Sequence, residues 1–177
     1  MNKFYRLLRY DWPMHFVYLL TNWMPDNVAL IRFRGWLMSP FFFKAGKNIQ
    51  VGRDVTFYNP SKIELGDSVY IAKGCWLCGG ENIRIGDKVL LGPYVVIVTS
   101  NHSIKDGTYY DGPPVKADNV DIGYGSWIGA HVTILGGTMT GDGTMVAANS
   151  VISGTTENFS IYGGVPAKFI KYADKTK

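Results

Sequence analysis

Apolar and small residues recur in pairs every six residues between Val120 and Ile152. The two members of a pair stand two positions apart, as Val120 and Ile122 do, so both side chains lie on one side of a short strand. Six residues are too few for a strand plus a helix, so each strand must bend directly into the next. Gly123 and Gly129 each follow a pair directly, at the position where a tight corner requires a small residue. Three such strands and corners make a triangular coil. Stacked coils predict an all-β solenoid, a parallel β-helix.

The repeat begins near Phe43 with a longer period of twenty residues. Residues 63–67 (Ile-Glu-Leu-Gly-Asp) return as residues 83–87 (Ile-Arg-Ile-Gly-Asp), and the next copy opens at Val120, thirty-seven residues after the second. A coil of twenty residues accounts for only part of this interval. The seventeen additional residues predict a protruding loop at about residues 100–116. Long loops on rigid scaffolds are usually functional. We therefore expect about five coils and one loop of functional interest.

The residue between the members of each pair should point outward, which defines three faces of a prism. The first face would carry Lys44, Glu64, Arg84, Asp121 and Met139; the second Gln50, Tyr70, Leu90, Trp127 and Met145; the third Thr56, Trp76, Val96, Thr133 and Val151. The first face is polar. Large apolar residues on the other two predict that the N-terminal segment or other subunits cover them, and we expect a homo-oligomer of prisms packed side by side.

The repeat divides the chain into a helical arm at 1–42, a solenoid domain at 43–172 and a basic tail at 173–177. Within the arm, Asp11 and Asp26 are placed as helix N-caps. The arm would either pack over the open end and apolar flank of the solenoid or contact a membrane surface. Packing is favoured because apolar stripes at helical spacing usually face a core. The membrane hypothesis rests on interleaved basic and aromatic residues: Arg6, Arg9, Trp12, Trp23, Arg32, Arg34 and Trp36.

Charge is distributed unevenly along the 177 residues, although the net charge is only +4. Residues 1–47 carry seven basic and two acidic side chains, residues 48–164 seven and eleven, and residues 165–177 four and one. A body without a basic stripe argues against nucleic-acid binding, whereas basic ends favour anionic small molecules or anionic lipid.

The apolar runs are too short to span a bilayer and no signal peptide is evident, so we expect a cytoplasmic protein. From Gly163 onward, we expect a short helix or an extended tail.

His102, at the root of the long loop, is the leading candidate for catalysis, because a neutral imidazole can take a proton from a hydroxyl near pH 7. Trp127 points outward beside a corner glycine and suits an interface or a site equally well. His131 lies at a corner, where solvent exposure is favoured over catalysis. Cys75 and Cys78 form a C-x-x-C, but the register places Cys75 inward and Cys78 at a small corner position. Core packing is therefore favoured over a zinc or redox site.

Three motifs stand in order on this repeat: Ser100-Asn101-His102-Ser103, then Ile122-Gly123 with Trp127-Ile128-Gly129-Ala130, and finally Gly164-Val165-Pro166-Ala167-Lys168. With them, the chain from about Phe43 to Tyr172 resembles the hexapeptide-repeat acyltransferases. It is similar in particular to the maltose and galactoside O-acetyltransferases and to the bacterial exopolysaccharide O-acetyltransferases. The resemblance implies a left-handed parallel β-helix, assembled as a homotrimer with acetyl-CoA between neighbouring prisms.

The resemblance also implies roles for individual residues. His102 matches the general base, Trp127 lines the pantetheine and acceptor end, and the backbone N–H of Ala130 would hold the thioester oxygen. Acetyl transfer to a hydroxyl of a sugar or polysaccharide precursor would be direct, without an acyl-cysteine and without a metal. Lys168 and Lys171 are the expected phosphate partners, because Ser-Gly replaces the usual Thr-Lys after the last repeat. The residues assigned to acceptor or cofactor binding are Asn101, Trp127, Gly129, Ala130, Ala148, Lys168 and Lys171.

Several alternatives remain open at this point. The same scaffold could N-acetylate an amino-sugar nucleotide, or serve as a non-catalytic scaffold. A metalloenzyme of the γ-carbonic-anhydrase type needs three converging histidines, and one of the three in this chain, His15, lies in the arm. Ala72 and Gly80 replace the Asn and Asp that the sugar acetyltransferases use for the acceptor, which argues against simple galactosides or maltose.

Overall fold

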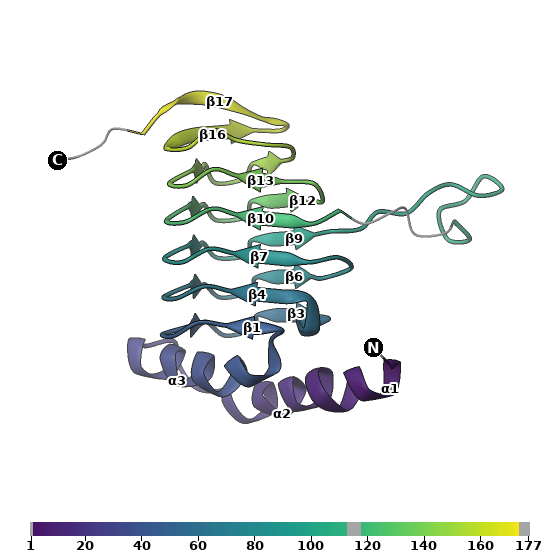
Figure 1. The fold of residues 1–177 in the computed structure, drawn as a ribbon, viewed down its shortest axis with the longest axis vertical. Helices are drawn as coiled ribbons and strands as arrows, with labels where there is room; N and C mark the ends of the chain where they lie inside the picture. Colours follow the sequence, from purple (N-terminus) through teal and green to yellow (C-terminus); the bar gives the residue numbers. More distant parts are fainter. Residues whose placement is uncertain (1, 113–117, 174–177) are drawn as a thin grey trace.

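The computed structural model describes residues 2–112 and 118–173, which form a column of stacked coils with helices across one end (Figure 1). Three parallel sheets make the sides of the column. Sheet A contains β1 (Lys44–Ala45), β4 (Ile63–Leu65), β7 (Ile83–Ile85), β10 (Val120–Ile122) and β13 (Met139–Thr140). Sheet B contains β2 (Gln50–Val51), β5 (Tyr70–Ile71), β8 (Leu90–Leu91), β11 (Trp127–Ile128), β14 (Met145–Val146), β16 (Ser160–Gly164) and β17 (Ala167–Tyr172). Sheet C contains β3 (Thr56–Tyr58), β6 (Trp76–Cys78), β9 (Val96–Val98), β12 (Thr133–Leu135) and β15 (Val151–Ile152).

The expected all-β solenoid is confirmed, with five complete coils and the start of a sixth at β16. Equivalent residues of successive coils pair in register, so that Ile63, Ile83 and Val120 form one buried row. The residues between them point outward, as the period of two requires. The chain leaves the column after β9 and returns at β10, where the sequence predicts the long loop (Figure 1).

The sequence pattern gives Phe43 and Ala45 as the first inward pair of the repeat, and this prediction is wrong at Phe43. That side chain is 62% exposed, whereas Phe42 is 4% exposed and lies edge-to-face against Phe57, with the ring centroids 4.8 Å apart. A 3₁₀ turn, η2 (Ser39–Phe41), ends just before this point, so the chain enters its first strand only at Lys44. The core of the first coil is therefore closed by the residue next to the predicted one.

The corners between sheets A and B show why the coils stack so closely. The carboxylate of Asp87 accepts a hydrogen bond from the backbone N–H of Asp67, 2.7 Å away, and Asp67 accepts in the same way from Lys47 at 2.6 Å. A Cβ atom on Gly66 would lie 2.6 Å from the backbone nitrogen of Asp87. Glycine is thus required by the next coil, and the aspartate that follows it ties the two coils together.

The N-terminal arm consists of α1 (Lys3–Arg6), the π-helical turn η1 (Leu7–Asp11), α2 (Trp12–Thr21) and α3 (Val28–Met38). The predicted caps are wrong. Asn2 and Asn27 cap the helices instead, each accepting a backbone N–H at 3.0 Å. Asp11 lies inside a continuous helix from residue 3 to residue 21, and Asp26 binds arginine side chains. Among the described residues, no helix has the length and apolar character needed to cross a membrane.

The packing expected of the arm is confirmed for the end of the solenoid but not for its flanks. Met14, Val17 and Met38 are buried in the same core as the first coil. The hydroxyl of Tyr18 accepts a hydrogen bond from the backbone N–H of Phe57 at 3.0 Å, and burial raises the pKa of this phenol. The apolar outward residues of sheets B and C remain exposed: Trp76 51%, Leu90 46% and Trp127 50%.

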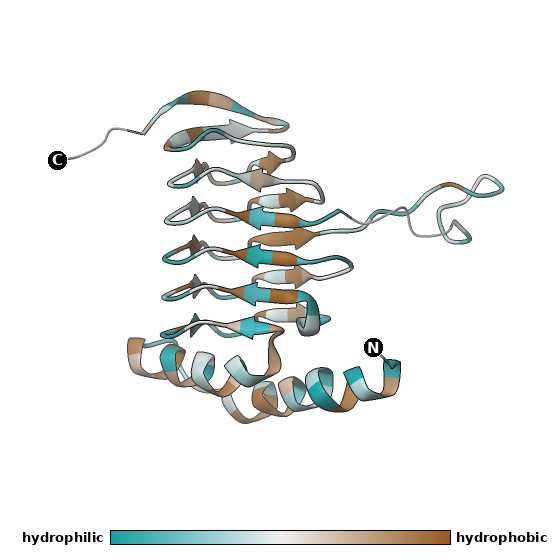
Figure 2. Ribbon diagram, in the orientation of Figure 1, coloured by the Kyte–Doolittle hydropathy of each residue, from teal (hydrophilic) through white to brown (hydrophobic). Residues whose placement is uncertain are grey.

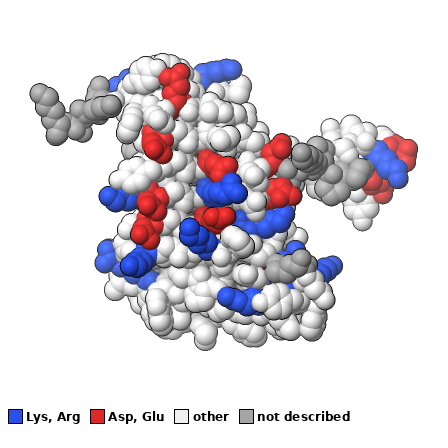
Figure 3. All heavy atoms as spheres, in the orientation of Figure 1, with Lys and Arg blue, Asp and Glu red and all other residues white. Residues whose placement is uncertain are grey.

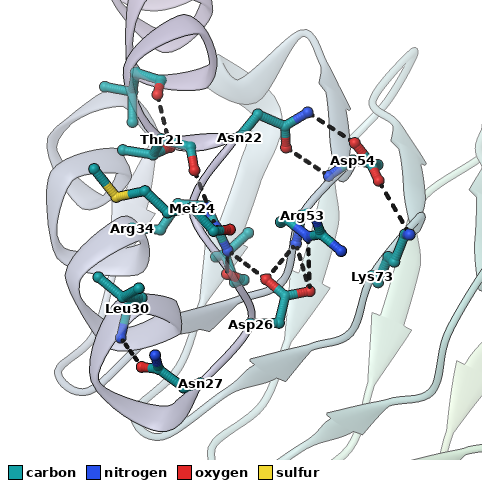
Figure 4. A network of polar contacts seen from close by, with 12 residues as sticks. Thr21, Asn22, Met24, Asp26, Asn27, Leu30, Arg34, Arg53, Asp54 and Lys73 are labelled. Carbon is teal, nitrogen blue, oxygen red and sulfur yellow. Dashed lines mark hydrogen bonds and ion pairs between the residues drawn. The ribbon is translucent and has the colours of Figure 1, made fainter.

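A buried arginine joins the arm to the first coil (Figure 4). Arg34 is 1% exposed, and its guanidinium donates to the carbonyl oxygens of Val51, Thr21 and Met24. The same group forms an ion pair with Asp26 at 3.0 Å. Asp26 also accepts the backbone N–H of Arg53, at 3.1 Å. One cation thus connects α3, the turn before it and strand β2.

The C-terminal segment forms neither a helix nor an isolated tail. Strands β16 and β17 pair antiparallel, with Gly164 opposite Ala167, and β16 pairs parallel with β14. The expected extended conformation is correct, and the expected helix is wrong. The hairpin closes the upper edge of sheet B, because its main-chain groups continue the ladder of the solenoid.

We predict that Arg34→Leu destabilises the protein by about 3 kcal/mol, because Asp26 and three carbonyl oxygens lose a buried partner. Urea unfolding would measure the change. Arg53→Gln is the matched control: its Nε lies 3.7 Å from the same carboxylate, but its side chain is 36% exposed, so the loss should stay below about 1 kcal/mol. Equal midpoints for wild type and Arg34→Leu would contradict this role of the arginine.

Candidate active site

Trp127 lies in the middle of a row of side chains that runs across sheet B. Register places it opposite Leu90 on one side and Met145 on the other, and the row continues through Ile161 to Lys171. The indole is half-exposed. The row therefore joins an apolar surface on β11 and β14 to a cationic side chain on β17. Strands of one sheet lie about 4.8 Å apart, so Lys171 lies about 14 Å from Trp127 along the row.

The two corners that follow β11 and β14 present backbone amides. Gly129 and Ala147 donate to the carbonyl oxygens of Val146 and Tyr162, both at 2.8 Å, and so continue the ladder. In the chain segments that the structure describes, the next amides, those of Ala130 and Ala148, donate no hydrogen bond. A Cβ atom on Gly129 would lie 2.6 Å from the nitrogen of Ala148. These corners hold two available N–H donors in successive coils, at the edge of sheet B next to Trp127.

His102 lies four residues after the end of β9, near the start of the loop, and is solvent-exposed. It lines an open hollow with Asn101, Tyr109 and Tyr110. No side chain among the described residues hydrogen-bonds its imidazole. The group that orients the ring is therefore not supplied by the described part of its own loop.

A single chain does not bring His102 and Trp127 together. The loop leaves the corner between sheets C and A, whereas Trp127 lies on sheet B. In a triangular prism that corner is opposite sheet B, and Figure 1 shows the loop extending away from the column. The predicted site residues fall into two groups on opposite sides of the molecule: Asn101 and His102 in the loop, and Trp127, Gly129, Ala130, Ala148, Lys168 and Lys171 around sheet B.

The sequence interpretation missed two aromatic residues of the loop. Tyr109 is 62% exposed and Tyr110 94% exposed, and both face the hollow beside His102. Adjacent tyrosines in a long polar loop are a signal for ligand contact, because they combine apolar area with a hydroxyl. His131 lies at a corner as expected, exposed, with φ of 57°. Its ring stacks on Tyr94 of the preceding coil, 5.0 Å away.

The cysteines occupy the positions that the register predicted. Cys75 is fully buried and Cys78 partly buried, and they form no disulfide. Burial raises the pKa of the Cys75 thiol to about 11, so the group stays protonated and is a poor nucleophile. Across residues 2–112 and 118–173, no group of three metal-binding side chains converges.

Comparisons with known proteins agree with this geometry. No family model matches the chain. The chain is 30% identical over 181 residues to WbbJ of Escherichia coli K12, whose name describes an O-acetyl transferase of lipopolysaccharide biosynthesis, and the match covers 90% of this chain and 87% of WbbJ. A hexapeptide-repeat acetyltransferase of Vibrio cholerae, solved with acetyl-CoA, is 25% identical, with a TM-score of 0.82 and coverage of 98% and 91%. The chain belongs to the hexapeptide-repeat acetyltransferases.

A further solved member of the family has a nearly identical fold. The maltose O-acetyltransferase of Clostridium difficile 630 superposes with a TM-score of 0.83 at 25% identity, covering 98% of this chain and 90% of that one. The Vibrio cholerae acetyltransferase was solved with acetyl-CoA. The residues of this chain suit that ligand, because the free N–H groups of Ala130 and Ala148 can bind amide and thioester oxygens and Lys171 can bind a phosphate.

We predict that iodoacetamide at pH 8 leaves Cys75 of the native protein unmodified. With a pKa of about 11, only about 0.1% of the thiol is ionised at that pH, and burial blocks access as well. Mass spectrometry of digested protein would compare both cysteines before and after unfolding in urea. Cys78 is the internal control, because its side chain reaches solvent. Rapid native labelling of Cys75 would contradict the assignment to the core.

Proposed function

We propose that this protein transfers the acetyl group of acetyl-CoA to a hydroxyl of a sugar or polysaccharide precursor. The observation that carries the proposal is the pair of unpartnered corner amides, Ala130 and Ala148, beside Trp127 on sheet B. Free N–H groups in successive coils suit a ligand that extends along the column, as the pantetheine arm does. The name of WbbJ, a relative covered over most of its length, supports an acceptor from polysaccharide synthesis.

The proposed mechanism is direct transfer in a ternary complex. The imidazole of His102 takes the proton of the acceptor hydroxyl while the hydroxyl oxygen attacks the thioester carbon. The negative charge that develops on the thioester oxygen is held by the N–H of Ala130. The C–S bond then breaks, and the CoA thiolate takes the proton from the imidazolium. No cysteine takes part in these reaction steps, which agrees with the buried, protonated thiol of Cys75.

The active unit of the proposal is a homotrimer. His102 and Trp127 lie on opposite sides of one chain, so a loop must meet sheet B of a neighbouring copy to complete the site. The exposed apolar residues of sheets B and C, Leu90, Trp127 and Trp76, would be covered by the same packing. A closed ring gives every copy the same two contacts.

The acceptor is proposed to differ from simple galactosides and maltose. Gly80 lies at the root of the loop, where a Cβ atom would be 3.0 Å from the hydroxyl of Ser100. An aspartate at this position would crowd the loop. The polar groups present instead are Lys62 and Glu81, which form an ion pair at 3.1 Å beneath the loop. They are candidates for contact with acceptor hydroxyls.

We expect acetyl-CoA to raise the melting midpoint of both wild type and His102→Ala. Saturation at a hundred times the dissociation constant stabilises a protein by about 2.7 kcal/mol. His102→Ala should release CoA at a rate about a hundredfold to ten-thousandfold lower across a panel of sugar acceptors. His15→Ala, an exposed histidine of α2, is the matched control and should keep full activity. A midpoint unmoved by acetyl-CoA would contradict the proposed function, and a fully active His102→Ala would contradict the base.

Mixed trimers test whether two copies share each site. His102→Ala and Trp127→Ala should each be inactive alone. After the two variants are unfolded and refolded together, about one quarter of the sites in a random cyclic trimer would combine an intact loop with an intact sheet B. CoA release should recover to about that fraction of the wild-type rate. Without recovery, although light scattering shows trimers, the shared site would be excluded.

A further inference from the structure

We infer that the outer face of the N-terminal arm is a docking surface for an anionic membrane. The arm closes the solenoid with one face, and the opposite face carries large apolar side chains that nothing in the described chain covers. This inference does not depend on the proposed transfer reaction. It concerns the end of the column, away from the row on sheet B (Figure 1).

The outer stripe is continuous along the first long helix. Exposed apolar side chains recur every three or four residues, on the face opposite the buried Met14, Val17 and Thr21. The stripe consists of Phe4, Tyr5, Leu8, Trp12, Phe16, Leu19, Leu20 and Trp23, each more than half exposed. Leu7, Trp12, Phe16 and Leu19 contribute to a shallow apolar groove on this helix. A helix with apolar residues on both faces requires a second apolar environment.

The next helix continues the same surface. In α3, Ile31, Arg34 and Met38 face the core, whereas Val28, Phe33 and Trp36 are exposed, Trp36 by 68%. Phe33 and Trp36 stack with ring centroids 6.1 Å apart. Figure 2 shows apolar residues along both helices at the base of the column. Tryptophan in particular favours the boundary between water and lipid.

The charges at this end are basic. Lys3, Arg9 and Arg32 are exposed, and none of them forms an ion pair within the described chain. Both acidic residues of the arm are neutralised, Asp11 by Arg6 at 3.4 Å and Asp26 by Arg34. Figure 3 shows a mainly uncharged base with basic atoms at its margin, whereas acidic atoms lie over the solenoid. An apolar surface edged by arginine and lysine complements the headgroups of anionic lipid.

This charge distribution favours a membrane over a second copy of the chain. Two arms packed face to face would bring Lys3, Arg9 and Arg32 of both copies together, where like charges repel. Anionic headgroups would neutralise the same side chains. The three exposed tryptophans of the arm, Trp12, Trp23 and Trp36, would then lie at the level of the headgroups.

Co-sedimentation of the full chain with lipid vesicles tests the inference. Wild type should bind vesicles of phosphatidylcholine and phosphatidylglycerol more tightly than vesicles of phosphatidylcholine alone. The double variant Trp23→Ser/Trp36→Ser should lose at least about tenfold in affinity, because it removes two exposed indoles. Lys3→Gln and Arg32→Gln should each lose about fivefold, on anionic vesicles only. Circular dichroism and the melting midpoint would show that these exposed substitutions leave the fold intact.

Met139→Ser is the matched control, since this apolar side chain is 53% exposed on sheet A, away from both the arm and the proposed trimer contacts, and its replacement should leave vesicle binding unchanged. Failure of wild type to sediment with anionic vesicles would overturn the inference. So would equal binding by wild type and Trp23→Ser/Trp36→Ser. Association of copies that disappears in the double variant, without vesicle binding, would assign the surface to a second copy instead. None of these outcomes bears on acetyl-CoA binding, so the two proposals can fail separately.

Discussion

The close approach of successive coils at the corners is the constraint on which the structure depends. A Cβ atom on Gly66 or Gly129 would lie 2.6 Å from a backbone nitrogen of the next coil, so at these two corners only glycine permits the observed spacing. That spacing aligns the strands in register and stacks the inward residues into continuous rows. The core therefore results from stacking, and no single coil could bury its own apolar side.

The corner amides are bonded on one edge of the column and unpartnered on another. Between sheets A and B, aspartates such as Asp67 and Asp87 occupy the corner amides of the preceding coil. Between sheets B and C, alanine stands in the equivalent position, and the amides of Ala130 and Ala148 are left without a partner in the described chain. An unpartnered N–H at an exposed corner costs little because water reaches it, and it remains available to a ligand. A change of one side chain thus decides whether the corner amide is bonded to the next coil or left available.

Much of the fold could be predicted from the sequence, because a six-residue period admits few arrangements. The strands, the outward faces and the protruding loop follow from it. The errors concern contacts that periodicity does not encode. Asp26 has the local sequence pattern of a helix N-cap, but its carboxylate forms an ion pair with Arg34 instead. The two residues come together only when the arm folds. The separation of His102 from Trp127 also escapes a linear interpretation, since it arises from the order of the three sheets around the prism.

Packing of the arm on the solenoid and contact of the arm with a membrane do not exclude each other. A helix presents two faces, and Met14 and Val17 use one to close the solenoid while Trp12 and Phe16 remain exposed on the other. The buried Arg34 fixes α3 on strand β2, so the outer face has a defined direction relative to the coils. In a ring of side-by-side prisms, such as the proposed trimer, all three arms would lie at one end. Three weak contacts acting together would bind a surface far more tightly than one, with the row on sheet B held away from that surface in each copy.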